Sequence, residues 1–330
     1  MPYFIAFDLE GPLTPLDAAF QLFVAAPNGP SLFRTISRYD DILVLEGREG
    51  YEPGDTLSLI LPFLLHHNVG EKDIESLGKG APLVPGASDT VQELSRQGWE
   101  IFCISTSYQQ FASAIASRVG ISFDRLASTP LPLGEFYTHF GDEDRITVSE
   151  IEAILGSYAD TELDIKATSI LDGIFWDRLP KTGVGRMMAQ VVPVGGARKV
   201  KRLVEFLERC SLTLKDAAVV GDSITDRNML SAVDKAGGLA VAFNANSYAL
   251  SVATVGLAST NLMDILPLTR AWGDEGRSGA EAFVREAETK GGVGDREHFF
   301  WLSGRDDLSL PIETHSRIRY VVRAEAAALG

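Results

Sequence analysis

The sequence predicts an α/β protein with a doubly wound parallel sheet at its centre. Short apolar runs, long enough for buried strands but too short for helices, alternate with amphipathic helical segments. Several runs end at acidic or hydroxyl-bearing residues, which is where a parallel sheet places its ligand-binding crevice. With 330 residues, the chain has room for a full α/β domain and one or two further modules.

Five apolar runs are the expected strands. They occupy residues 4–7, 100–104, 217–220, 239–243 and, more weakly, 253–257. The second run leads through Ser105 and Thr106 into an amphipathic helix, which makes a βα unit typical of a parallel sheet. Ser107 stands at the start of that helix and is interpreted as its N-cap. A strongly helical segment over residues 197–209 precedes the third run.

A first inserted segment, residues 15–81, interrupts this alternation. It contains a helical stretch, a break at residues 27–30 and Ser31 as the expected N-cap of the next helix. A further helix is expected to begin near Asp55, because apolar residues follow it at helical spacing.

A second inserted segment, residues 136–190, is harder to interpret. Thr147–Glu150 matches a capping box and predicts a helix that begins there. The preceding acidic residues, Asp142, Glu143 and Asp144, are interpreted as a solvated loop rather than as metal ligands. After residue 272 the chain becomes glycine-rich and polar, with helical pieces expected over residues 280–287 and 318–328.

Composition excludes several classes of function. A formal net charge of −15 argues against nucleic acid as a partner, because phosphate backbones require clustered basic residues. The same charge would repel a phosphorylated substrate and therefore favours a divalent cation at the site. Two cysteines cannot form a disulfide framework, and neither a signal peptide nor a membrane span is recognised. We expect a cytoplasmic protein without membrane contact.

The polar residues at strand ends and helix starts form one chemically consistent set. They are Asp8 and Glu10 after the first run, Ser105 after the second, Lys199 on the helix before the third, and Asp222 and Asp226 after the third. A carboxylate can attack phosphorus, and a second carboxyl group can protonate the leaving oxygen. Hydroxyl and ammonium groups can hold phosphoryl oxygens, and two aspartates on a tight turn can hold Mg²⁺. The set therefore predicts phosphoryl transfer through an aspartyl phosphate.

These residues resemble the motifs of the haloacid dehalogenase (HAD) superfamily, in particular its phosphoserine phosphatase branch. Residues 8–14 resemble the first motif, Ser105–Tyr108 the second, the helix with Lys199 the third, and Gly221–Asp226 the fourth. The resemblance covers residues 1–135 and 191–268. Lys201 and Arg202 share the helix with Lys199, and the distance along the chain to Asp222 favours Lys199.

The resemblance implies a Rossmann-like core formed by residues 1–14, 82–135 and 191–268. It implies that residues 15–81 are a helical cap, with residues 136–190 as an insertion or second cap and residues 269–330 as a C-terminal extension. Its site residues follow by motif. The nucleophile is Asp8 and the general acid/base Glu10; Ser105, Thr106 and Lys199 bind phosphate; Asp8, the backbone carbonyl of Glu10, Asp222 and Asp226 bind Mg²⁺.

Two departures bear on the substrate. Glu10 stands where most phosphatases of the superfamily have aspartate, so the proton donor reaches one methylene further. Asp17 lies where the family has the acidic residue that meets a substrate amine, but no basic cap residue for a carboxylate can be placed. The candidates Arg34, Arg38 and Arg48 are equally well explained as surface charges.

Two hypotheses of function follow. The first is a Mg²⁺-dependent phosphatase or phosphotransferase that acts on a small phosphorylated metabolite, with phosphoserine as one candidate. The second is a HAD-like accessory or binding protein with little catalysis. A looser similarity of residues 8–14 and 175–199 to uncharacterised archaeal HAD-like proteins, sometimes labelled as hydrogenase-associated, supports the second. In either case we expect residues 136–190 to be a candidate surface for oligomerisation or for a protein partner.

Overall fold

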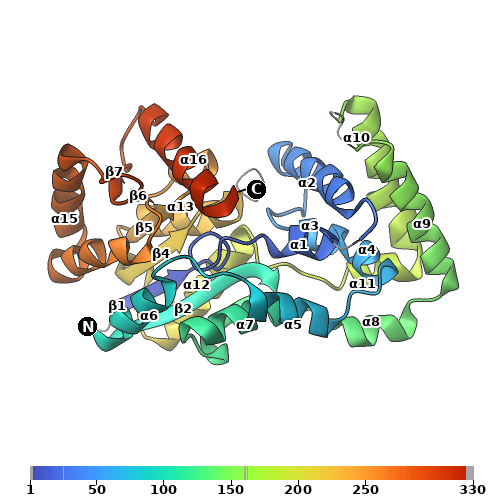
Figure 1. Ribbon diagram of the computed structural model, residues 1–330, viewed down its shortest axis with the longest axis horizontal. Helices are drawn as coiled ribbons and strands as arrows, with labels where there is room; N and C mark the ends of the chain where they lie inside the picture. The colour runs from blue at the N-terminus through green and yellow to red at the C-terminus, as the bar shows by residue number, and fades with distance from the viewer. Residues whose placement is uncertain (1–2, 25, 160, 162, 325–330) are drawn as a thin grey trace.

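A seven-stranded sheet forms the centre of the molecule (Figure 1). The computed structural model describes residues 3–24, 26–159, 161 and 163–324. The strands are β1 (Tyr3–Phe7), β2 (Trp99–Tyr108), β3 (Leu126–Thr129), β4 (Ala217–Gly221), β5 (Leu239–Phe243), β6 (Val255–Ala258) and β7 (His298–Trp301). Their order is β3-β2-β1-β4-β5-β6-β7, and all neighbours are parallel except β6 and β7. The predicted α/β class with a mostly parallel sheet is confirmed.

The apolar run of β1 is continuous because both faces of the sheet are covered. Phe4 and Ala6 pack with α12 (Ala197–Arg209) and α13 (Arg227–Lys235) on one face. Ile5 and Phe7 pack with α6 (Ala87–Arg96) and α7 (Gln109–Val119) on the other. All four side chains are fully buried. Since β1 lies between β2 and β4, its C-terminal end is the centre of the carboxyl edge of the sheet.

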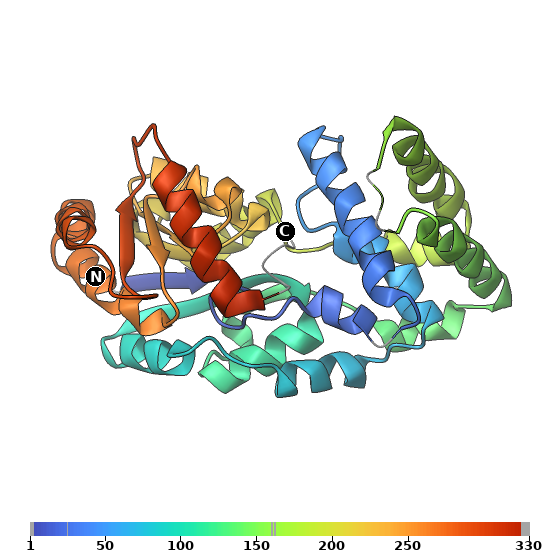
Figure 2. The same cartoon turned by 45° about the horizontal axis from the view of Figure 1, so that its top comes forward.

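Helices from the two inserted segments pack together. The first segment provides α1 (Ala18–Val24), α2 (Gly29–Leu45), α3 (Thr56–Leu59), α4 (Leu61–His66) and α5 (Glu71–Gly80). The second provides α8 (Leu133–His139), α9 (Asp142–Gly156), α10 (Ile165–Asp172), a π-helical turn (Gly173–Arg178) and α11 (Gly183–Met188). Helix α9 packs on α2 and α4, whereas α5 packs mainly on α7 of the core. The helices of the two segments other than α5 are here called the cap, and Figures 1 and 2 place α2, α9 and α10 at the end of the molecule away from β7.

Aromatic side chains join the two segments inside the cap. Tyr39 of α2 stacks on Phe175, with ring centroids 5.6 Å apart. The indole nitrogen of Trp176 donates a hydrogen bond of 2.7 Å to the Tyr39 hydroxyl. Phe175 and Trp176 are thus packing residues, and they hold residues 136–190 against the helix that faces the sheet edge.

Two helix starts predicted within the inserted segments are wrong. Helix α2 begins at Gly29 after Asn28, whose backbone is left-handed (φ 55°), so Ser31 lies inside the helix. Helix α9 begins at Asp142, ahead of the predicted capping box Thr147–Glu150. The acidic residues expected in a loop form its first turn, where the N-terminal end of the helix dipole favours carboxylates. Asp144 caps the turn by accepting a hydrogen bond from Gly141 N (3.4 Å).

The C-terminal segment is more regular than its composition suggests. It contains α15 (Leu266–Lys290), interrupted at Gly276 (φ 63°), then β7 and α16 (Ser309–Arg323). Strand β7 extends the sheet by antiparallel pairing with β6, from Trp301 opposite Val255 to His298 opposite Ala258. Helix α16 begins nine residues before the predicted start at residue 318, and residues 325–328 of the prediction lie outside the described residues. No helix in the described part of the chain is long and apolar enough to cross a membrane.

Candidate active site

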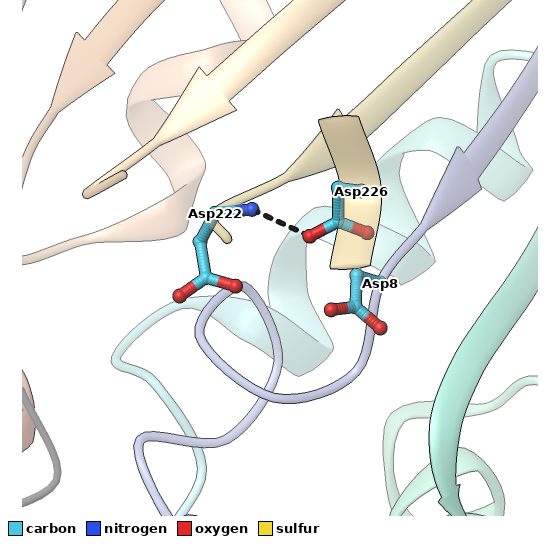
Figure 3. Close-up of side chains that lie close together, drawn as sticks. All are labelled: Asp8, Asp222 and Asp226. Carbon is cyan, nitrogen blue, oxygen red and sulfur yellow. Dashed lines mark hydrogen bonds between the residues drawn. The ribbon is translucent and has the colours of Figure 1, made fainter. Parts of the chain in front are cut away.

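Three aspartates meet at the carboxyl edge of the sheet (Figure 3). Asp8 follows β1, Asp222 follows β4, and Asp226 closes the turn after it. Each has a carboxylate oxygen within 4.8 Å of one from each of the others, and all three side chains are buried. They meet because β1 and β4 are neighbours in register, with Asp8 N donating 2.8 Å to the Val220 carbonyl.

The turn after β4 fixes Asp226 and depends on glycine. Asp226 Oδ2 accepts hydrogen bonds from the backbone nitrogens of Asp222 (3.0 Å) and Ser223 (3.2 Å). A Cβ on Gly221 would lie 2.5 Å from the Asp226 carboxyl carbon. Gly11, at φ 95°, passes Asp222 so closely that a Cβ would lie 2.4 Å from its carboxyl carbon. Both positions therefore require glycine.

Lys199 lies beneath the aspartates in the first turn of α12. Its ammonium group is 2.9 Å from Asp8 Oδ1 and 2.7 Å from Asp226 Oδ1, and its side chain is fully buried. Burial opposes the charge, but the carboxylates of Asp226 and Asp8 outweigh it and raise the pKa of Lys199. Lys201 and Arg202 are exposed, so the structure brings Lys199, rather than either alternative, to the site.

The aspartates are an oxygen-donor set that suits Mg²⁺. Burial raises the pKa of Asp8 well above its ordinary value, and the charges of Asp226 and Asp222 add to this effect against that of Lys199. A hard divalent cation among these carboxylates would relieve the repulsion that raises the pKa. The donor set thus fits the metal, while the part expected of the Glu10 backbone carbonyl stays a prediction.

The hydroxyl-bearing residues lie on β2 itself, which continues to Tyr108. Ser105 Oγ is buried and accepts a hydrogen bond from Ser107 N (3.1 Å). Thr106 Oγ1 donates 3.0 Å to the Val194 carbonyl. The N-cap predicted for Ser107 is wrong, because α7 begins at Gln109 with no side-chain cap and Ser107 Oγ instead donates to Glu10 Oε1.

Glu10 and Asp17 lie close to each other beside the aspartates. Glu10 Oε1 also accepts a hydrogen bond from Ala18 N (3.2 Å), and Asp17 Oδ1 accepts one from Phe20 N (2.8 Å). Burial and the charge of Asp17 raise the pKa of Glu10 to about 7. Burial likewise raises the pKa of Asp17. Glu10 can therefore donate a proton and take one back near neutral pH.

Two arginines of the site were missed by sequence reasoning. Arg319 and Arg323, one turn apart on α16, both donate to Asp222 Oδ2, the bond from Arg323 measuring 2.7 Å. Their spacing on one face of the predicted C-terminal helix was the available signal. The arginines proposed from sequence are elsewhere: Arg38 bonds to the Tyr158 carbonyl (3.1 Å), and Arg48 pairs with Asp172 (2.7 Å).

A cavity of about 120 Å³ opens between the sheet edge and the cap. It is lined by site residues from the core, by helices α2 and α3 of the cap, and by the end of α16. Its polar lining includes Asp8, Glu10, Asp17, Ser37, Asp40, Asp41, Ser105, Thr106, Ser107, Asp222, Arg319 and Arg323. Arg34, Arg38 and Arg48 are not among the described residues that line it.

Solved structures with a similar fold were found for this chain. The structure of gene product AF1437 from Archaeoglobus fulgidus matches with a TM-score of 0.87 and 28% identity, over 100% of this chain and 99% of that one. A substrate-bound phosphoserine phosphatase matches with a TM-score of 0.53 and 17% identity, over 81% and 97%. A phospho-aspartyl intermediate analogue of phosphoserine phosphatase matches with a TM-score of 0.52 and 18% identity, over 80% and 97%. The chain shares the fold of these phosphoserine phosphatases over about four fifths of its length. No family model and no curated protein matches the sequence.

The phosphoserine phosphatase-like fold that the four motifs implied is thereby confirmed. The phosphoserine phosphatases are matched over nearly their whole length, whereas about a fifth of this chain has no counterpart in them. AF1437 covers the full chain, so its structure shares the overall architecture, C-terminal segment included.

The buried carboxyl group of Asp40 in the cavity wall gives a test of stability. Burial raises its pKa from 3.8 to about 7, against hydrogen bonds from Tyr51 and Thr56. Ionising Asp40 thus costs more in the folded than in the unfolded protein; the cost appears as pH rises above about 4 and is complete above 7. We expect Asp40→Asn to stabilise the protein at pH 8 by up to about 4 kcal/mol and to have little effect at pH 4.

Urea unfolding of the Asp40→Asn variant and the wild type at the two pH values measures this difference. Asp41→Asn, at the exposed neighbouring position, is the matched control and should change stability less. An equal effect of Asp40→Asn at pH 4 and pH 8 would show that ionisation of Asp40 is not the cause.

Proposed function

We propose that this protein is a Mg²⁺-dependent phosphatase that hydrolyses a small phosphorylated metabolite through an aspartyl phosphate on Asp8. The observation that carries the proposal is the cluster of Asp8, Asp222 and Asp226 over buried Lys199, where the cluster borders a cavity. A nucleophilic carboxylate, a cation that orients it and a metal-binding pair are the groups that phosphoryl transfer needs. The HAD phosphatase fold supports the same assignment.

Asp8 is the proposed nucleophile. Lys199 holds Oδ1, so Oδ2 lies outside this ion pair and can attack phosphorus. The attack forms an acyl-phosphate bond between Asp8 Oδ2 and phosphorus and breaks the bond from phosphorus to the leaving oxygen. Mg²⁺, held by Asp8, Asp222 and Asp226, would supply positive charge for the phosphoryl oxygens. The Ser105 hydroxyl, buried in the cavity wall, is the proposed donor to one of those oxygens, while phosphate binding by Thr106 and Lys199 stays a prediction.

Glu10 moves the protons. Its protonated form gives a proton to the leaving oxygen, and the resulting carboxylate then takes a proton from water. That water attacks phosphorus, breaks the bond to Asp8 and releases inorganic phosphate. Ser107 and Ala18 hold one carboxyl oxygen of Glu10 in place throughout.

Phosphate release from a panel of phosphorylated metabolites, with Mg²⁺ and with a chelator, tests the proposal. We expect release that needs the metal. No release from any member of the panel by a folded protein would contradict it and would favour the accessory-protein hypothesis. A protein partner on residues 136–190 and a cytoplasmic location stay predictions.

The role of Glu10 has its own prediction. Glu10→Gln cannot exchange a proton, so we expect turnover to fall about 10²- to 10⁴-fold while Mg²⁺ still binds. Steady-state kinetics and calorimetric metal titration measure the two quantities. Glu208→Gln, on an exposed face of α12, is the control. Turnover within threefold of wild type in Glu10→Gln would rule out the acid/base role.

A further inference from the structure

The C-terminal helix α16 is fixed against the site from outside the cap. His315 Nδ1 accepts a hydrogen bond from Ala245 N (2.9 Å), and Arg319 Nη1 donates one to the Asn244 carbonyl (3.1 Å). Both contacts lie just beyond the end of β5. Figures 1 and 2 agree that the C-terminal end of α16 lies between the sheet and the cap helices. The helix thus presents its last two turns to the cavity in a fixed orientation.

Arg319 and Arg323 are the two cationic side chains among the described residues that line the cavity. The same lining contains the carboxyl groups of Asp8, Glu10, Asp17, Asp40, Asp41 and Asp222. Lys199 is fully buried behind the wall, already paired with Asp8 and Asp226. An anion that enters the cavity therefore meets positive charge from this chain at α16.

The hydrogen bonds of Arg323 use two of the three nitrogens of its guanidinium group. Nε donates 3.2 Å to the Pro15 carbonyl and Nη1 donates 2.7 Å to Asp222 Oδ2. Its Nη2 has no hydrogen bond to any residue that the structure describes. Because a planar guanidinium group carries five N–H donors, Arg323 can hold Asp222 and bind an oxyanion together.

We propose that Arg319 and Arg323 form an anion subsite that binds the phosphoryl group of the substrate and the phosphate product. In the absence of an anion the two arginines neutralise Asp222, in competition with Mg²⁺. When phosphate binds, its negative charge interacts with both the arginines and the metal. Mg²⁺ and phosphate therefore strengthen each other's binding, by the same factor in each direction.

The subsite depends on the proposed phosphatase site for its metal, so its test measures binding without turnover. Calorimetry is done on the full chain with Mg²⁺ alone and with inorganic phosphate at saturating Mg²⁺. We expect Arg323→Gln and Arg319→Gln to bind phosphate at least tenfold more weakly. We expect the same variants to bind Mg²⁺ alone at least threefold more tightly, because a cation next to Asp222 is gone. Arg323→Lys should retain part of the phosphate affinity.

Arg317→Gln is the matched control, because Arg317 is on the same helix but exposed and paired with Asp295. Opposite changes in the two affinities cannot result from a damaged fold, which would weaken both. Phosphate affinity within twofold of wild type in both glutamine variants overturns the subsite, as does a parallel loss of phosphate and Mg²⁺ binding. A wild-type protein that binds no Mg²⁺ overturns the proposed function instead.

Discussion

Asp8→Asn is expected to lower metal-dependent phosphate release at least about 10⁴-fold, because the amide cannot form the covalent intermediate. The fold should persist, since the substitution removes a buried charge that Asp226 and Asp222 repel. Lys199 keeps its other partner, Asp226. Steady-state phosphate release and thermal unfolding of the same preparation measure both effects.

Asp124→Asn provides the control for Asp8→Asn. Asp124 is exposed near Arg209, far along the chain from the cluster, and its loss should leave turnover unchanged. Turnover of Asp8→Asn within tenfold of wild type would exclude Asp8 as the nucleophile.

Lys199→Met is expected to destabilise the protein by about 3–5 kcal/mol, the usual cost of leaving buried charges without their partner. Its ammonium group is the cation between Asp8 and Asp226, and all three side chains are buried. Methionine retains the length of the side chain, so the loss of stability results from the missing charge rather than from a cavity. Urea unfolding at neutral pH measures it.

Lys201→Met, on the exposed face of the same helix, should change the free energy of unfolding by less than about 0.5 kcal/mol. Added Mg²⁺ should restore part of the stability of Lys199→Met, because a cation then returns to the carboxylates. Equal stability of the Lys199 and Lys201 variants would contradict the claim that the Lys199 ammonium group stabilises the buried carboxylates.

The three aspartates and Lys199 were predictable because the local sequence determines where they lie. Asp8 follows one buried apolar run, and Asp222 and Asp226 follow another. Because the two runs form neighbouring parallel strands, these residues must lie at the same edge of the sheet. Distance along the chain distinguished Lys199 from Lys201, and the burial of Lys199 agrees. The parallel sheet followed from the same patterns, whereas the phosphatase-like fold followed from the resemblance of the four motifs.

The remaining features depend on contacts between distant segments. Ser107 has a good N-cap composition, but its hydroxyl bonds to Glu10, 97 residues away in sequence. Strand β7 has only four residues and pairs at the sheet edge, so its pattern is too short to recognise. Arg319 reaches Asp222 across 97 residues, and its spacing to Arg323 on one helix face does not by itself distinguish a site arginine from a surface arginine.

The cap shows the same limit. The contact between its two segments depends on the stacking of Tyr39 on Phe175 and on the hydrogen bond from Trp176 to Tyr39. These residues are more than 130 positions apart in the sequence. Helical periodicity could indicate α2 and α9 separately, but it carries no information about which helix faces which.

Mass spectrometry of the acid-quenched protein tests the central claim most directly. The protein is incubated with Mg²⁺ and its best substrate from the panel, quenched during turnover and digested. We predict a phosphoryl group on the peptide that contains Asp8, absent when Mg²⁺ is chelated and absent in Asp8→Asn. Rapid turnover with the Asp8 peptide unmodified at every quench time, or with the phosphoryl group on another residue, would contradict the aspartyl-phosphate mechanism.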